Sequence, residues 1–225
     1  MTEPRPTGPA IEAGAAQRPV RTTLRGRAID LVPLEAAHAD DLFAAAGGAD
    51  RSALWDYMPD GPYQDVAPFR DAIARKVASD DPLFFAILDK PSGRAVGHAA
   101  LMRVDAANRV VEVGNIMFGA PLQRTVGATE SMALLAGHVF DGLGYRRYEW
   151  KCNALNAPSR RAAERLGFLF EGIFQQHMIV KGRNRDTAWY AMLDGDWPAR
   201  RDAFAAWLAP DNFDQQGRQR RPLAP

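Results

Sequence analysis

Apolar residues recur every three or four positions in several stretches of the chain, which is the spacing of helices with one buried face. Val66, Phe69, Ile73 and Val77 mark one such helix, and the apolar positions of residues 132–143 mark another that stops at Gly144. Alanine-rich residues 35–48, residues 157–167 and residues 195–210 predict three more helices.

Other stretches alternate or are rich in β-branched and aromatic residues, and these predict strands. Residues 21–34 contain a Gly turn and predict a hairpin or two edge strands. The segments LFFAIL, AVGHAALMRV and RVVEVGNIMFG are separated by turn signals and predict a three-stranded antiparallel meander. RRYEWKCN predicts one half-buried strand, and FLFEGIFQQHMIV and RDTAWYAML predict two more around KGRN. The expected fold class is mixed α/β: a mostly antiparallel sheet flanked by helices, with one strand–helix–strand crossover.

The 225-residue length suits one domain. Residues 1–19 are rich in Pro, Ala and Gly and predict a disordered leader, and residues 20–208 predict the domain. Residues 209–225 predict a solvated tail, which includes the basic cluster Arg218, Arg220 and Arg221.

Composition narrows the class of protein. The chain is 47% hydrophobic and 24% charged, as is usual for soluble globular proteins, and its net charge of +1 favours neither nucleic acid nor membrane as a partner. The single cysteine, Cys152, fits a reducing compartment, and the start of the chain lacks the apolar segment of a signal peptide. We therefore expect a cytoplasmic protein. No His/Cys cluster has metal-ligand spacing, so we expect no metal.

A first candidate ligand site is the helix start after the strand that ends at Phe118. Unpaired backbone N–H groups and a partial positive charge at a helix N-terminus favour phosphate. Gly127 and Ala128 would let a ligand approach the backbone, and side-chain donors precede them. An ordinary loop with a helix cap is the alternative. The candidate binding residues are Gln123, Arg124, Thr125, Val126, Gly127, Ala128 and Thr129.

A second helix start follows the next strand. Asn156 and Ser159 stand at its entrance, and Gly167 lies just past its end. Both residues are ordinary capping residues when taken alone. Two helix starts at the ends of neighbouring strands, however, could hold an extended ligand with a phosphate end and an amide arm.

The segments LQRTVGATESMALLAGHVF and YEWKCNALNAPSRRAAERLGFLFEG resemble the coenzyme A-binding core of the GNAT N-acetyltransferase superfamily. The likeness covers about residues 20–197 and is nearest to the branch of ribosomal-protein N-terminal acetyltransferases. It implies acetyl-CoA as co-substrate, with its pyrophosphate on residues 123–129. The pantetheine arm would lie between the strand ending at Phe118 and the strand around Trp150. Asn156 would bond that arm, Ser159 would lie near the thioester sulfur, and Arg161 would also contact the cofactor.

The chain departs from the family pattern at two positions. Val126 stands where the phosphate turn usually has its first Gly, so its backbone geometry is expected to differ. Ala163 stands where many members have a Tyr that protonates the departing thiolate. Ser159 or a water is the expected substitute. These departures also fit the alternative function, a CoA-binding sensor or assembly module without turnover.

Acyl transfer to an amine needs a base, and Glu112 is the first candidate. It interrupts the apolar strand VVEVGNIMF, on the side that alternation gives to Val110, Gly114 and Ile116. Burial would raise its pKa toward useful values, although a structural ion pair with an arginine is the alternative. His177 is a rival base because unperturbed histidine titrates near neutrality.

The amine acceptor is expected to meet the loop LWDYMPDGPY between the first two helices. Trp55, Tyr57 and Met58 are the candidate acceptor-binding residues there, with His98 from the meander, although lid packing and core packing are the alternatives. The implied reaction is direct transfer of acetyl from acetyl-CoA to a primary amine, either a protein N-terminus or a small molecule. The superfamily also makes a homodimer one expectation.

Overall fold

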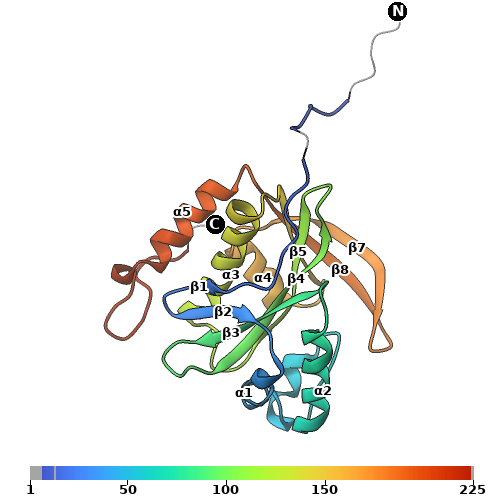
Figure 1. The fold of residues 1–225 in the computed structure, drawn as a ribbon, viewed down its shortest axis with the longest axis vertical. Coiled ribbons are helices and arrows are strands. Elements are labelled where there is room, and N and C mark those ends of the chain that lie inside the picture. Colours follow the sequence, from blue (N-terminus) through green and yellow to red (C-terminus); the bar gives the residue numbers. More distant parts are fainter. Residues whose placement is uncertain (1–6, 13, 224–225) are drawn as a thin grey trace, which may run out of the picture.

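One eight-stranded sheet forms the centre of the computed structural model, which describes residues 7–12 and 14–223 (Figure 1). The strand order across it is β1-β2-β3-β4-β5-β6-β8-β7, and β5 with β6 is the parallel pair. The predicted mixed α/β class and three-stranded meander are confirmed. The strands are β1 (Leu24–Arg25), β2 (Ile29–Pro33), β3 (Leu83–Asp89), β4 (Ala95–Asp105), β5 (Val110–Phe118), β6 (Arg147–Asn153), β7 (Leu169–Val180) and β8 (Arg183–Leu193).

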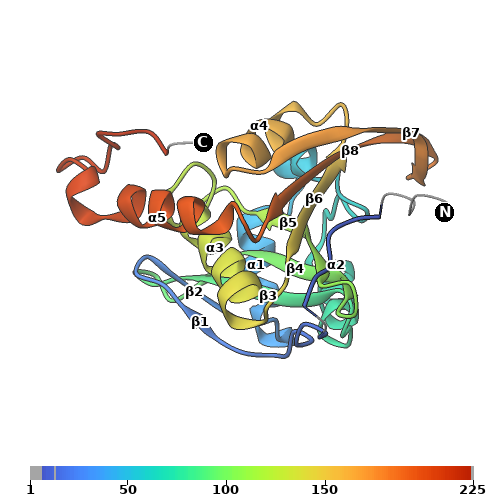
Figure 2. The same cartoon turned by 90° about the horizontal axis from the view of Figure 1, so that it is seen from above.

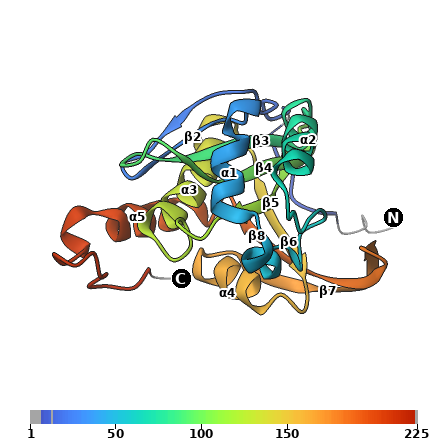
Figure 3. The ribbon, with the colours of Figure 1, turned by 90° about the horizontal axis from the view of Figure 1, so that it is seen from below.

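Helices cover both faces of the sheet (Figures 2 and 3). The helices α1 (Ala39–Ala46) and α2 (Val66–Val77) lie on one face, and α3 (Val126–Gly137), α4 (Ala157–Arg165) and α5 (Trp197–Leu208) lie on the other. Short 3-10 helices span η1 (Ala36–His38), η2 (Ala49–Trp55) and η4 (Pro210–Asn212), and a π-helical turn, η3 (His138–Gly142), extends α3. The β7–β8 hairpin projects past the body of the sheet (Figure 1).

Each helical layer has its own apolar core. Leu135 and Val139 from the α3 side pack with Val111, Val113 and Trp150 of the sheet. Phe69 and Ile73 of α2 join the smaller core on the opposite face. Burying side chains of this size contributes roughly 1.5–3 kcal/mol each, so these two cores fix the layers on the sheet.

Described residues in the predicted leader and in the predicted tail contact the domain. The Ala16 N–H donates to the Ala106 carbonyl over 2.9 Å and the Gln17 N–H to the Leu143 carbonyl over 3.0 Å, so the predicted disordered leader already packs on the domain there. Leu223 is buried in the larger core. Contacts to the domain thus occur on both sides of the predicted boundaries at residues 20 and 208, and the boundaries themselves stay predictions. Residues 1–6, 13 and 224–225 lie outside the described residues.

Candidate active site

The parallel strands β5 and β6 separate from each other along their length. They pair over four residues, Val110–Val113 with Arg147–Trp150, and β5 then continues to Phe118 while β6 continues to Asn153. The facing backbone edges beyond Val113 and Trp150 are free of each other. A flexible chain that carries amide groups could therefore lie between these edges and bond to them.

A β-bulge in β5 lies where this separation begins. His98 pairs with Met117 and Ala100 with Gly114, so β5 holds one more residue than β4 there, and Asn115 has a φ of 48°. The extra residue reverses the alternation. Ile116 therefore packs toward the α3 side, and the prediction that it shares a face with Glu112 and Gly114 is wrong.

The first predicted helix start is present at α3. Thr125 is its N-cap, and its hydroxyl oxygen accepts the Ala128 N–H over 3.3 Å. Arg124 is exposed beside it, so its side chain can reach a ligand at this end of the helix. Gln123 is also exposed, and its side-chain amide donates to the Phe118 carbonyl at the end of β5 over 2.8 Å. Arg124 has a φ of 63°, a left-handed conformation that turns the loop sharply into the helix.

The glycine in this turn has a different role from the predicted one. A Cβ on Gly127 would lie 2.7 Å from Cγ2 of Ile29, so the missing side chain lets α3 pack closely on β2. Gly127 is buried, and Val126 and Ala128 are partly exposed. The missing side chain of Gly127 is therefore explained by helix packing, and ligand contact with its backbone stays a prediction.

A cavity of about 690 Å³ adjoins the same helix start. Arg124, Thr125, Val126 and Gly127 line one side of it. A second part of its wall comes from the C-terminal part of the chain and contains Trp207, Phe213, Gly217, Arg218 and Gln219, and Asp89 at the end of β3 also lines the cavity. Sequence reasoning missed this wall, because nothing local in residues 207–219 indicates that they pack against a turn some 90 positions earlier.

The second helix start, at α4, is also present. Asn156 is the predicted N-cap, and its Oδ1 accepts the Ser159 N–H over 3.1 Å. Trp150 of β6 donates its indole N–H to the Ser159 hydroxyl oxygen over 3.0 Å. Ser159 thus lies between α4 and the strand that forms one side of the separation. Arg161 is exposed on α4.

Ala163 within α4 and Cys152 on β6 offer no chemistry of their own. Ala163 is fully buried, so the position of the family tyrosine is filled by core packing. Burial raises the pKa of the Cys152 thiol, which keeps it protonated and a poor nucleophile.

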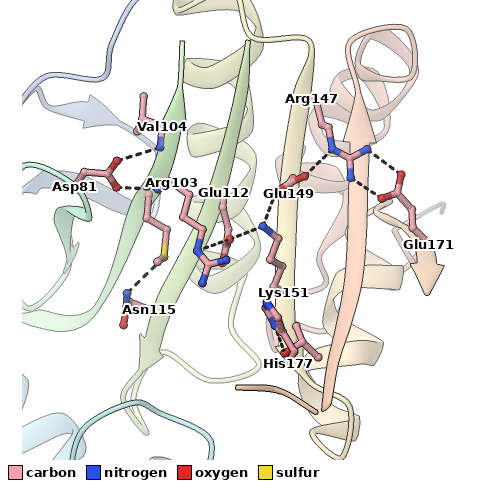
Figure 4. A network of polar contacts seen from close by, with 12 residues as sticks. Asp81, Arg103, Val104, Glu112, Asn115, Arg147, Glu149, Lys151, Glu171 and His177 are labelled. Carbon is pink, nitrogen blue, oxygen red and sulfur yellow. Dashed lines mark hydrogen bonds and ion pairs between the residues drawn. The ribbon is translucent and has the colours of Figure 1, made fainter. Parts of the chain in front are cut away.

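Glu112 lies in a row of charged side chains across the sheet face opposite α3 and α4 (Figure 4). Lys151 Nζ lies 3.0 Å from Glu112 Oε2, as an ion pair without hydrogen-bond geometry, and 2.6 Å from Glu149 Oε2. Arg103 Nε is 3.5 Å from the same Glu112 oxygen. We name this row the charged face; its members are Arg103, Glu112, Arg147, Glu149, Lys151, Glu171 and Arg185.

The two oxygens of Glu112 face different surroundings. Oε2 faces Lys151 and Arg103, whereas Oε1 lies 3.3 Å from where a Cβ on Gly114 would stand, toward the bulge. Burial raises the pKa of Glu112, and the charges of Lys151 and Arg103 oppose that rise. The arginine ion pair therefore exists, and it leaves one carboxylate oxygen directed along β5.

His177, the rival base, lies on β7 beside the same row (Figure 4). Its Nδ1 is 3.0 Å from the Thr187 hydroxyl oxygen. Partial burial lowers the pKa of His177, and the cations Arg103, Arg185 and Lys151 lower it further. Its imidazole is therefore neutral near pH 7 and able to accept a proton.

His98 is fully buried, and an acceptor could not touch it without a rearrangement. Its ring packs edge-on against Phe84, and burial lowers its pKa to about 3. The core-packing alternative accounts for the burial of His98, and its contact with the acceptor stays a prediction.

The predicted acceptor loop forms hydrogen bonds with two distant segments of the chain. Tyr57 donates its hydroxyl to the Leu155 carbonyl over 3.2 Å, and Lys181 Nζ donates to the Trp55 carbonyl over 2.7 Å. Tyr57 is exposed, whereas Trp55 and Met58 are buried as lid packing would have them. The loop thus bridges the β6–α4 connection and the tip of the β7–β8 hairpin.

A model of the acetyltransferase (GNAT) domain matches residues 29–169, more than half of the chain. The chain belongs to the GNAT family. It is therefore an acetyl-CoA-dependent N-acetyltransferase with the GNAT fold.

Relatives agree with this assignment. A GCN5-related N-acetyltransferase from Brucella melitensis is 50% identical, with a TM-score of 0.91 over 93% of this chain and 95% of that one. A probable GNAT-family acetyltransferase from Chromobacterium violaceum is 38% identical, with a TM-score of 0.79 over 88% and 100%. The putative ribosomal N-acetyltransferase YdaF from Bacillus subtilis is 28% identical over 47% of this chain and 57% of its own length.

In this GNAT enzyme α3 follows β5 and α4 follows β6, so both helices begin after the separated ends of these strands. Glu112 lies on β5 in the paired part just before the separation, on the opposite face of the sheet. Sequence reasoning missed Lys151 and Arg185, whose positions opposite other strands carry no local signal. Among the described residues, no helix is long and apolar enough to cross a membrane. Within that same part of the chain, no group of three His, Cys, Asp or Glu side chains could hold a metal.

Proposed function

We propose that this N-acetyltransferase moves the acetyl group of acetyl-CoA directly to a primary amine within a ternary complex. The separation of β5 from β6 beside two helix starts carries the proposal. It offers a backbone-lined path for the pantetheine arm, and the α3 start offers N–H groups and Arg124 for the pyrophosphate. The cavity walled by Trp207 and Phe213 is the nearest room for the rest of the nucleotide.

The chemistry requires one new bond and two proton movements. The amine nitrogen bonds to the thioester carbonyl carbon as the carbon–sulfur bond breaks. Glu112 Oε1 takes the amine proton, directly or through a water, and Ser159 supplies a proton to the departing thiolate. A backbone N–H on the free edge of β5 near the bulge stabilises the charge on the carbonyl oxygen.

The acceptor class is the open part of the proposal. The name of the Bacillus subtilis relative supports a protein N-terminus, and a small amine is the other candidate. Tyr57 and the exposed tip of the β7–β8 hairpin flank the acceptor side, which suits a peptide that reaches the surface.

The test is thiol release from acetyl-CoA in the presence of free-N-terminus peptides, amino acids, polyamines and aminoglycosides, each against a no-acceptor control. Release with one class, together with acetylated product by mass spectrometry, supports the proposal. If CoA raises the melting temperature while every acceptor is silent, the CoA-binding sensor without turnover replaces it.

Direct transfer has its own control. Incubation with acetyl-CoA alone should leave the mass of the protein unchanged, and a Cys152→Ala variant should keep the wild-type rate. An acetylated protein that then passes its acetyl group to an amine would contradict direct transfer.

A further inference from the structure

The charged face holds one cation more than its carboxylates neutralise. Glu112 contacts Arg103 and Lys151, Glu149 contacts Arg147 and Lys151, and Glu171 contacts Arg147. Arg185 is the remaining cation of the face. Among the described residues no carboxylate oxygen lies within 4 Å of its guanidinium nitrogens.

Arg185 is also short of hydrogen bonds. Its Nε is buried and has no acceptor among the described residues, and burial lowers its pKa. Buried donors are nearly always satisfied in proteins, and leaving one unsatisfied costs on the order of 1–3 kcal/mol. The indole N–H of Trp189, four residues along β8, is likewise buried without an acceptor in the described structure. Two unused donors thus lie on one strand of this face.

His177 lies between these two donors. It contacts Thr187, which stands midway between Arg185 and Trp189 on β8, and its ring centroid is 5.9 Å from that of Trp189. Lys151 Nζ lies over the Trp189 ring, 3.7 Å from its centroid. Arg103 and Lys151 near His177 are paired with Glu112 and Glu149, so Arg185 supplies the unpaired positive charge beside a neutral imidazole, and this charge attracts an anion.

We propose that Arg185 binds a carboxylate of the acceptor, so that the preferred substrates are amines that also carry a carboxylate. This proposal rests on the proposed acetyl transfer and adds the substrate class. Guanidinium and carboxylate groups match in shape and charge, which makes arginine the suitable partner for such a group.

The geometry sets where the carboxylate lies in the acceptor. Glu112 is on β5 and Arg185 on β8, two strands further across the sheet. Arg185 is also displaced along β8 from Ala191, the residue in register with Glu149 and, through it, with Glu112. The amine and the carboxylate are therefore several bonds apart. A dicarboxylic amino acid and a peptide with an acidic second residue both fit this requirement.

Matched acceptors test the proposal. Glutamate against glutamine forms the small-molecule arm, and peptides with Glu or Gln at the second position form the peptide arm. We expect kcat/KM to favour the carboxylate member of at least one pair by about ten- to one-hundredfold, the range for a hydrogen bond to a charged group. Arg185→Gln should abolish that ratio, and Arg185→Lys should keep part of it.

Arg183→Gln is the matched control, because Arg183 is exposed on the same strand and should leave the ratio unchanged. Loss of overall rate with an unchanged ratio in Arg185→Gln would indicate a structural role and overturn the proposal. Equal use of the paired acceptors by the wild-type enzyme would overturn it as well.

A second readout separates this proposal from acetyl transfer itself. Succinate added to the full chain with CoA should raise the pKa of His177 measured by NMR, and Arg185→Gln should remove the response. If no acceptor is acetylated but succinate still raises the pKa of His177, the transfer proposal fails and the carboxylate site stands. If neither effect occurs, both fail.

Discussion

The indole N–H of Trp150 donates to the Ser159 hydroxyl oxygen over 3.0 Å. Trp150 lies on β6, beside the β5–β6 separation, so this strand orients the Ser159 hydroxyl of α4. Accepting this bond leaves the hydroxyl hydrogen of Ser159 available for donation, and the sulfur of Cys152 is one acceptor beside it. A group held in this way can supply a proton repeatedly from one position, which is the role that the absent family tyrosine would have.

Replacing Ser159 by Ala should therefore lower kcat by about 10²–10⁴-fold with a smaller change in CoA affinity. It should also cost roughly 1–3 kcal/mol in the free energy of unfolding, because the Trp150 donor loses its acceptor. Ser159→Thr retains a hydroxyl and should recover most of both. Thiol-release kinetics and urea denaturation measure the two effects, and unchanged kcat in Ser159→Ala would assign the proton to water.

Asn156→Asp separates capping from cofactor binding. The aspartate oxygen can still accept the Ser159 N–H, so the free energy of unfolding should be maintained, but the amide donor is lost. If that donor bonds the pantetheine arm, CoA should bind about two- to tenfold more weakly in a calorimetric titration. Asn156→Ala should lose both functions, with about 1 kcal/mol of stability. Wild-type CoA affinity in both variants would remove Asn156 from the binding site.

Glu112→Gln tests the base through the pH dependence of kcat/KM. A catalytic carboxylate must be ionised, so the wild-type rate should fall as pH drops through the pKa of Glu112, which burial raises. The glutamine variant should lose this acid limb and about 10²–10⁴-fold in rate. A full rate between about pH 6 and 9 would move the role to His177, and His177→Gln is then the decisive variant.

Lys151→Met should destabilise the fold by about 3–5 kcal/mol, because it leaves Glu112 and Glu149 facing each other without their shared cation. Its loss should raise the pKa of Glu112 further. A carboxyl whose folded-state pKa is raised loses stability as pH rises through that pKa, so the deficit should be larger at pH 8 than at pH 5. Adding Glu112→Gln should recover part of it in urea denaturation. Additive effects of the two changes would contradict the pairing.

His98 makes the fold sensitive to acid. Its pKa is about 3 in the folded protein against 6.5 as the ordinary value, so the unfolded chain binds a proton first as pH falls. Stability from the neutral ring is present above pH 6.5 and is lost progressively toward pH 3. His98→Leu should flatten the dependence of unfolding free energy on pH over that interval, measured by denaturant titrations at several pH values. An unchanged slope would show that other groups dominate acid unfolding.

Local signals were enough to predict most elements of the fold. Phe69 and Ile73 at helical spacing, and the Asn156 cap with Gly167 past the helix end, are encoded within a few residues. The bulge at Asn115 was not predicted, because an extra residue shows only when β5 is paired with β4. The bulge is the reason that Ile116 faces the α3 side of the sheet and not the side of Glu112.

The candidate site was predicted in the same uneven way. The helix starts around Thr125 and Asn156 follow from short motifs. The pairing of Glu112 with Lys151, and the isolation of Arg185, depend on which strands become neighbours in the sheet. No periodicity within one segment contains that information.

The burial of Ala16 and Leu223 bears on how this enzyme could be recombined with its relatives. The matched family segment, residues 29–169, ends before β8, α5 and the wall of the cavity beside α3. A chimera that exchanges only that segment would combine residues 29–169 of one protein with the β8 and α5 part of another. Compatibility of such hybrids should therefore depend on residues that a family alignment does not contain.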